Sequence, residues 1–153
     1  MPAGQGLGLA AHYSFVTYVA AVVEVAVNPK GEIVVPRIDV AVDCGPQVNP
    51  DRVRSQIEGA CIMGLSQAVL SEITFKNGRV QQDNFHQFEV ARMTLAPKKI
   101  VVHLMPSSYD VPLGGVGEPG VPVIAPALCN AIAAATGKRI RQLPLRDQLS
   151  SPG

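Results

Sequence analysis

Small and β-branched residues alternate with other residues along the N-terminal third of the chain. Residues 15–27 place one such set on a single face, as a strand requires: Val19, Ala21, Val23, Val25 and Val27. Residues 28–31 have the composition of a turn. The alternation then resumes, with a second apolar set on one face: Val34, Pro36, Ile38, Val40 and Val42. The two segments predict an antiparallel hairpin.

Two features complicate this N-terminal region. Pro36 has no backbone N–H to donate, so its strand must be an edge at this point or carry a local irregularity. Gly4, Gly6 and Gly8 suggest a phosphate-binding loop, but such a loop follows a strand and opens a helix, whereas the segment after Gly8 looks extended. We expect residues 4–8 to be a flexible entry into the first strand.

The apolar period changes to three and four between residues 49 and 69, which predicts an amphipathic helix. Asn49 suits the N-cap and Pro50 the first helical position. The apolar face comprises Val53, Ile57, Ala60, Cys61, Gly64, Leu65, Ala68 and Val69. Gly59 and Gly64 each cost a helix about 1 kcal/mol relative to alanine, so a sheet or a ligand is expected to pack closely there.

The next segment contains a second hairpin and a loop. Asn77 and Gly78 both tolerate positive φ and predict a tight turn between two short strands, residues 72–75 and 79–81. Residues 82–97 have no clear period and are expected to form a loop. Its apolar side chains are expected to anchor it to the core: Phe85, Phe88 and Met93.

The C-terminal third completes an α+β pattern. Residues 99–105 predict a strand, and residues 125–136 predict an alanine-rich helix with Pro122 or Pro126 in its first turn and Gly137 at its end. Locally pairing strands with interspersed helices indicate an α+β fold rather than a parallel doubly wound sheet. No repeat or linker divides the chain, so residues 1–153 are expected to form one domain.

Composition limits the partners and cofactors that the chain can bind. Lys and Arg number 13 against 12 Asp and Glu, so the chain lacks the basic excess of a nucleic-acid-binding protein. We find no export signal and no apolar run long enough for a membrane span. The three cysteines suit buried free thiols rather than a zinc site or disulfides, and no histidine has metal-ligand spacing.

Glu118 is the carboxylate that the sequence singles out, within Gly-Val-Gly-Glu-Pro-Gly and shortly before the predicted C-terminal helix. Glycine lets another group approach this backbone closely. A helix N-terminus favours the ionised carboxylate that a base needs, whereas burial opposes it. Taken alone, such a motif is most often an ordinary turn.

Longer strings around this motif carry a family resemblance. Residues 115–145 resemble the C-terminal signature of the molybdenum hydroxylases of the xanthine oxidase and aldehyde oxidase family, most of all its isoquinoline 1-oxidoreductase and membrane-linked aldehyde dehydrogenase branch. Residues 42–72 are similar to the family's D-x-G, N-P and Q-I-E-G-A pattern, which precedes a glycine-rich helix. Residues 4–25 are also similar, so the resemblance covers nearly all of the chain.

The resemblance implies an enzyme that oxidises an aldehyde or N-heterocycle with water as the oxygen source. Its molybdenum is held by a pyranopterin and not by protein side chains, and iron–sulfur clusters on a partner subunit carry the electrons away. Glu118 matches the catalytic base, Gly117 lies beside the metal ligands, and Gln56 matches a glutamine at the cofactor. Without the resemblance, Gln56 would pass for an ordinary residue at the solvent border of its helix.

The chain is several times shorter than a molybdenum subunit of this family, so we expect it to hold part of a site. The expected partners are the missing N-terminal portion of that subunit and an iron–sulfur subunit, and uncovered apolar surface favours self-association. The alternative is a truncated, stand-alone α+β binding or structural module without catalysis. The resemblance leaves the compartment open between bacterial cytoplasm and periplasm.

Overall fold

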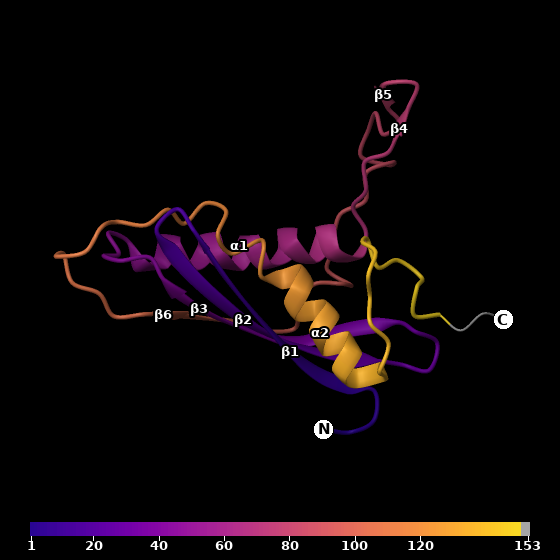
Figure 1. The fold of residues 1–153 in the computed structure, drawn as a ribbon, viewed down its shortest axis with the longest axis horizontal. Coiled ribbons are helices and arrows are strands. Elements are labelled where there is room, and N and C mark those ends of the chain that lie inside the picture. The colour runs from indigo at the N-terminus through magenta and orange to yellow at the C-terminus, as the bar shows by residue number, and fades with distance from the viewer. Residues whose placement is uncertain (151–153) are drawn as a thin grey trace.

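A mixed sheet and two helices build the chain, whose structure, a computed structural model, describes residues 1–150. Within that range the four-stranded sheet has the order β1-β2-β3-β6. Its strands are β1 (Gln5–Ser14), β2 (Thr17–Val27), β3 (Ile33–Asp43) and β6 (Ile100–Leu104), and its helices are α1 (Pro50–Val69) and α2 (Ile124–Thr136). Both helices lie over one face of the sheet (Figure 1). The α+β prediction is confirmed, with β3 and β6 pairing in parallel.

Strand β1 overturns the prediction of a flexible entry at residues 4–8. It pairs antiparallel with β2 along its whole length, from Gln5 opposite Ala26 to Ser14 opposite Thr17. A Cβ atom at Gly6 or Gly8 would come within 2.2 Å of Ala131 O or 2.1 Å of Ala127 O on α2. Glycine therefore occupies the inward positions where the helix backbone crosses the strand. The leucines that alternate with these glycines, Leu7 and Leu9, lie on the outward face and are exposed.

The β2–β3 hairpin is confirmed, but the predicted inner face of β3 is partly wrong. Glu24 pairs with Arg37 and Ala26 with Val34, so β3 carries one extra residue between these pairs. This β-bulge is the irregularity expected at Pro36, which has no N–H to donate. It reverses the alternation, so that Val34 is 48% exposed while its neighbour Val35 is 1% exposed.

Helix α1 begins and packs as its sequence predicts. The Asn49 side chain caps it by accepting a hydrogen bond from Arg52 N at 3.1 Å, and all of the predicted apolar positions are buried. A Cβ at Gly64 would lie 2.7 Å from Ile124 Cβ, so close packing against α2 explains that glycine. A Cβ at Gly59 would meet nothing within 4 Å in the described chain, so packing does not explain Gly59.

The second hairpin forms an arm that projects from the rest of the molecule (Figure 1). Its strands are β4 (Phe75–Lys76) and β5 (Arg79–Val80), and the turn has positive φ at Asn77 and Gly78, as predicted. The predicted anchoring of the following loop is wrong for Phe85 and Met93, which are 85% and 86% exposed, whereas Phe88 is half-buried. The chain runs out along the arm, and Leu95 rather than these side chains packs against the core.

Helix α2 and the cysteines agree with the sequence. Pro126 lies in the first turn, and Gly137 ends the helix in the left-handed conformation at φ 75°.

Cys44 and Cys61 are buried free thiols and Cys129 is half-buried. Burial raises the pKa of the Cys61 thiol to about 12. Within residues 1–150, neither helix is both long and apolar enough to cross a bilayer.

Candidate active-site loop

The loop between β6 and α2 presents Glu118 at the surface. The Glu118 side chain is exposed, whereas the next two residues, Pro119 and Gly120, are buried. The Glu118 carbonyl accepts a hydrogen bond from Val121 N at 2.9 Å, which starts the turns that lead into α2. The carboxylate therefore lies next to a buried segment, two turns before the helix, and it is open to a reactant.

Gln56 of α1 joins this loop directly. Its side-chain Nε2 donates a hydrogen bond to the carbonyl oxygen of Gly117 at 3.1 Å. The two residues are far apart in sequence, yet the bond places Gln56 beside the peptide that precedes Glu118. The structure thus brings together all three residues that the sequence proposed for the site.

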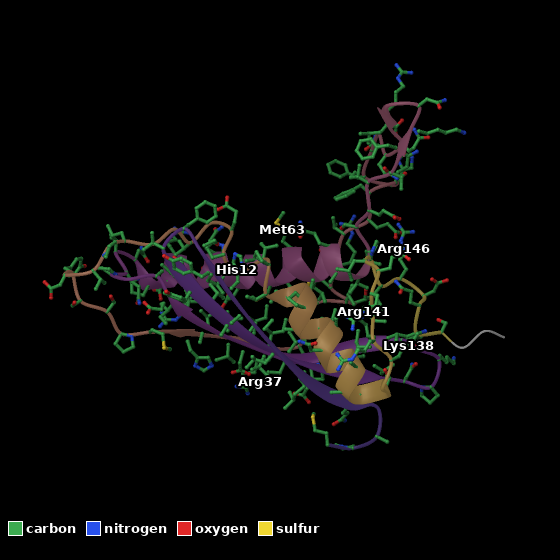
Figure 2. All side chains as sticks on the ribbon, viewed as in Figure 1. His12, Arg37, Met63, Lys138, Arg141 and Arg146 are labelled. Carbon is green, nitrogen blue, oxygen red and sulfur yellow. The ribbon has the colours of Figure 1, made fainter. Side chains whose placement is uncertain are left out.

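Three glycines lie around Gln56. Gly120 lets the loop pack closely on α1, whereas Gly59 and Gly117 leave open space beside Gln56. A Cβ at Gly120 would lie 2.9 Å from Ala60 Cβ on α1, so this end of the loop packs tightly. Within residues 1–150, a Cβ at Gly117 or at Gly59 would meet no atom within 4 Å. Gly59 lies one helical turn after Gln56, and Met63 follows on the same side, 55% exposed and pointing away from the sheet (Figure 2).

The other end of the loop is held by the turn between β1 and β2. Gly115 N donates to Phe15 O at 2.8 Å, and the buried Thr17 hydroxyl donates to Gly115 O at 2.7 Å. Gly114 N donates to Cys44 O at 2.9 Å. Sequence reasoning missed Thr17, because a lone threonine at the start of a strand carries no distinctive signal.

A separate polar cluster lies on the sheet face that the helices leave open. The Asp39 carboxylate accepts hydrogen bonds from the Arg37 guanidinium and, at 2.9 Å, from His103 Nε2. These bonds, first that of Arg37 and then that of His103, hold the pKa of Asp39 well below its usual range. Among residues 1–150, no group of three His, Cys, Asp or Glu side chains could hold a metal ion.

Known proteins share this sequence and fold. A family described as the molybdopterin cofactor-binding domain matches residues 4–97, which include Gln56 but not Glu118. The isoquinoline 1-oxidoreductase beta subunit of Brevundimonas diminuta is 37% identical over 96% of this chain and 19% of its own. The aldehyde oxidoreductase molybdenum-binding subunit PaoC of Escherichia coli K12 is 32% identical over 90% of this chain and 20% of its own.

The fold recurs in solved structures. Quinoline 2-oxidoreductase from Pseudomonas putida 86 superposes with a TM-score of 0.76 at 20% identity, over 86% of this chain and 18% of that one. This likeness supports the fold alone, whereas the sequence matches define the family. The chain spans about a fifth of the length of the curated relatives described here. By sequence and fold, the chain belongs to the molybdopterin cofactor-binding domain family, whose members include subunits of molybdenum-dependent oxidoreductases of the xanthine oxidase type.

Proposed function

We propose that residues 1–153 form one domain that supplies part of the active site of a molybdenum hydroxylase, with Glu118 as the general base. The substrate class is an aldehyde or N-heterocycle, and water is the source of oxygen. The observation that carries the proposal is the hydrogen bond from Gln56 Nε2 to Gly117 O. It joins the two segments that the family resemblance assigns to the cofactor and to the base.

The surface around Gln56 fits a large cofactor that brings its own metal ligands. The side-chain amide of Gln56 donates an N–H to the loop carbonyl of Gly117. Its amide oxygen is then left to accept a hydrogen bond from a pterin N–H. Gly59 and Gly117 add no side chains that would keep such a group away from the backbone. When bound, the molybdenum–pyranopterin group would supply the redox centre that accepts two electrons from the substrate.

The role of Glu118 in this site is proton transfer. Its exposed carboxylate can accept the proton of the attacking hydroxyl, and a positioned base of this kind contributes about 10²- to 10⁴-fold to rate. The fixed Gly117 carbonyl limits the movement of the following residue, so the carboxylate starts near its working position. Gln56 therefore has two roles: its amide oxygen would accept a hydrogen bond from the cofactor, and its amide N–H holds the loop that carries the base.

Electron transfer and substrate selection belong to other parts of the assembly. Relatives named for isoquinoline and aldehyde oxidation support the two substrate classes. The three cysteines are far apart in sequence; two of them are buried and the third is half-buried. This arrangement does not suit iron–sulfur ligation, so we assign the clusters to a partner subunit. The rest of the molybdenum subunit would supply the remaining cofactor contacts.

Affinity purification of the tagged chain from its native cells tests this function. We expect it to be recovered with the remaining molybdenum-subunit sequence and an iron–sulfur protein, and with molybdenum bound. A matched sample carrying Gln56→Ala should hold less molybdenum, because an acceptor for the cofactor is lost. Recovery of the wild-type chain without molybdenum would instead favour the stand-alone binding or structural module.

A further inference from the structure

The turn between β1 and β2 adopts a backbone that its residues do not favour. Phe15 and Val16 have φ of 52° and 62°, the left-handed values that a two-residue hairpin turn demands. Asn and Gly normally occupy such positions, and a β-branched residue such as valine is disfavoured there. Contacts from outside the hairpin must therefore help to hold this turn.

Those contacts come from the loop that carries Glu118. Both backbone polar groups of Gly115 are used by the turn, since its N–H donates to Phe15 O at 2.8 Å and its carbonyl accepts from Thr17 Oγ1 at 2.7 Å. Thr17 is 0% exposed, so water cannot replace its hydroxyl without opening the structure. The hydroxyl thus links the turn to the base loop at a buried point.

The packing at this point leaves the loop little freedom. A Cβ at Gly114 would lie 2.2 Å from Thr17 Oγ1 and 2.7 Å from Val16 O. The loop backbone therefore rests directly on the threonine hydroxyl. From Gly115, only Val116, which packs against the core, separates this anchor from Gly117 and its bond to Gln56.

We propose that Thr17 is a positioning residue for Glu118, which acts by fixing the loop through the Gly115 carbonyl. This inference rests on the proposed role of Glu118 as the base. Thr17 and Gln56 hold the loop from two sides, one from the sheet and one from α1, on either side of Val116. Without the Thr17 hydroxyl, the carboxylate would sample a wider range of positions and reach the reacting proton less often.

Hydrogen exchange on the full chain tests the anchor without any cofactor. Thr17→Ala and Thr17→Ser differ from each other by one hydroxyl. We expect Thr17→Ala to speed amide exchange in residues 114–117 by roughly 10-fold, as loss of one buried hydrogen bond implies, while Thr17→Ser stays close to wild type. Equal exchange in the two variants would overturn the anchor.

The same substitution at a second threonine, Thr136, controls for the loss of a side-chain hydrogen bond elsewhere in the chain. The Thr136 hydroxyl donates to Ile132 O at 2.8 Å at the C-terminal end of α2, whereas the loop precedes the N-terminal end of that helix. Thr136→Ala should leave exchange in residues 114–117 unchanged. If it speeds exchange there as much as Thr17→Ala does, the effect is not specific to Thr17 and the proposal fails.

Kinetics in the molybdenum-loaded assembly test the consequence for the base. Thr17→Ala should lower kcat by about 10-fold or more with KM and molybdenum content near wild type, and Thr17→Ser should restore kcat. Unchanged kcat in Thr17→Ala would refute the positioning role even if exchange confirms the anchor. A wild-type assembly that holds molybdenum but turns over neither substrate class would refute the proposed function, whereas the exchange result would still decide the anchor.

Discussion

At the residue scale, two side-chain hydrogen bonds hold the loop that carries Glu118: Gln56 Nε2 donates to Gly117 O, and Thr17 Oγ1 donates to Gly115 O. Glu118, Gly117 and Gln56 lie in strings distinctive enough to be assigned from the sequence, and the structure brings them together. Thr17 contributes a buried hydroxyl whose acceptor lies in a loop near the other end of the chain. Such a contact depends on the folded arrangement of β1, β2 and the loop, so no local pattern predicts it.

Gln56→Ala tests the proposed role of Gln56 between the loop and the cofactor. It removes the donor to Gly117 O, so we expect turnover per bound molybdenum to fall by about 10-fold, as loss of one well-placed hydrogen bond implies. The measurement is kcat normalised to metal content. Gln67→Ala, an exposed glutamine on the same helix, should leave that ratio unchanged. A loss of equal size in both variants would show that the effect is not specific to Gln56.

At the scale of elements, hydrophobic period and helix caps predicted most of the architecture, whereas close backbone packing and a β-bulge caused the errors in β1 and β3. The β2–β3 hairpin and both helices follow their hydrophobic patterns. Strand β1 escaped prediction because glycines replace its inward apolar side chains beneath α2. The inner face of β3 shifted because one extra residue at the bulge reverses a period of two.

Two glycines in α1 give a direct test of helix packing. Gly64→Ala should lower the free energy of unfolding by about 1–3 kcal/mol, because its Cβ would clash with Ile124 on α2. Gly59→Ala should raise it by about 0.5–1 kcal/mol, because alanine favours a helix and meets no neighbour in the described chain. Urea unfolding of the two variants measures both. Destabilisation by Gly59→Ala would contradict the open surroundings of Gly59 on α1.

The Asp39 cluster predicts a defined pH dependence of stability. Because hydrogen bonds lower the folded pKa of Asp39, its contribution is complete above the unfolded pKa of about 4 and is lost as pH falls through the folded value. At pH 7, Asp39→Asn should cost at most about 1 kcal/mol, since the cluster is partly exposed. Urea unfolding measures the difference in free energy of unfolding between wild type and Asp39→Asn. This difference should shrink as the pH falls below 5, and a difference that grows would contradict the lowered pKa of Asp39.

At the scale of the whole molecule, the chain exposes more surface than a self-sufficient protein of its size. Its accessible surface is 9226 Å², against about 7,400 Å² for a typical monomer of 16.1 kDa. The projecting arm carries several of its exposed apolar side chains: Phe75, Val80 and Phe85. Both features suit the proposed assembly, in which further protein segments would cover this surface.

The isolated chain is therefore expected to bind neither molybdenum nor pterin tightly, and to self-associate or bind a complementary subunit. One helix border and one loop cannot enclose a charged cofactor with enough hydrogen-bond partners. Elemental analysis and light scattering of the purified chain measure the two properties. Stoichiometric molybdenum in a strictly monomeric sample would contradict both.

The most direct test of the central claim is the turnover of Glu118→Gln in the molybdenum-loaded assembly. The amide keeps the shape of the side chain but cannot accept the proton, so we expect kcat to fall by at least about 10²-fold while the fold and the molybdenum content stay near wild type. Glu58→Gln, at an exposed carboxylate on α1, is the matched control and should keep its turnover. Near-normal turnover of Glu118→Gln with full metal occupancy would contradict the assignment of Glu118 as the base.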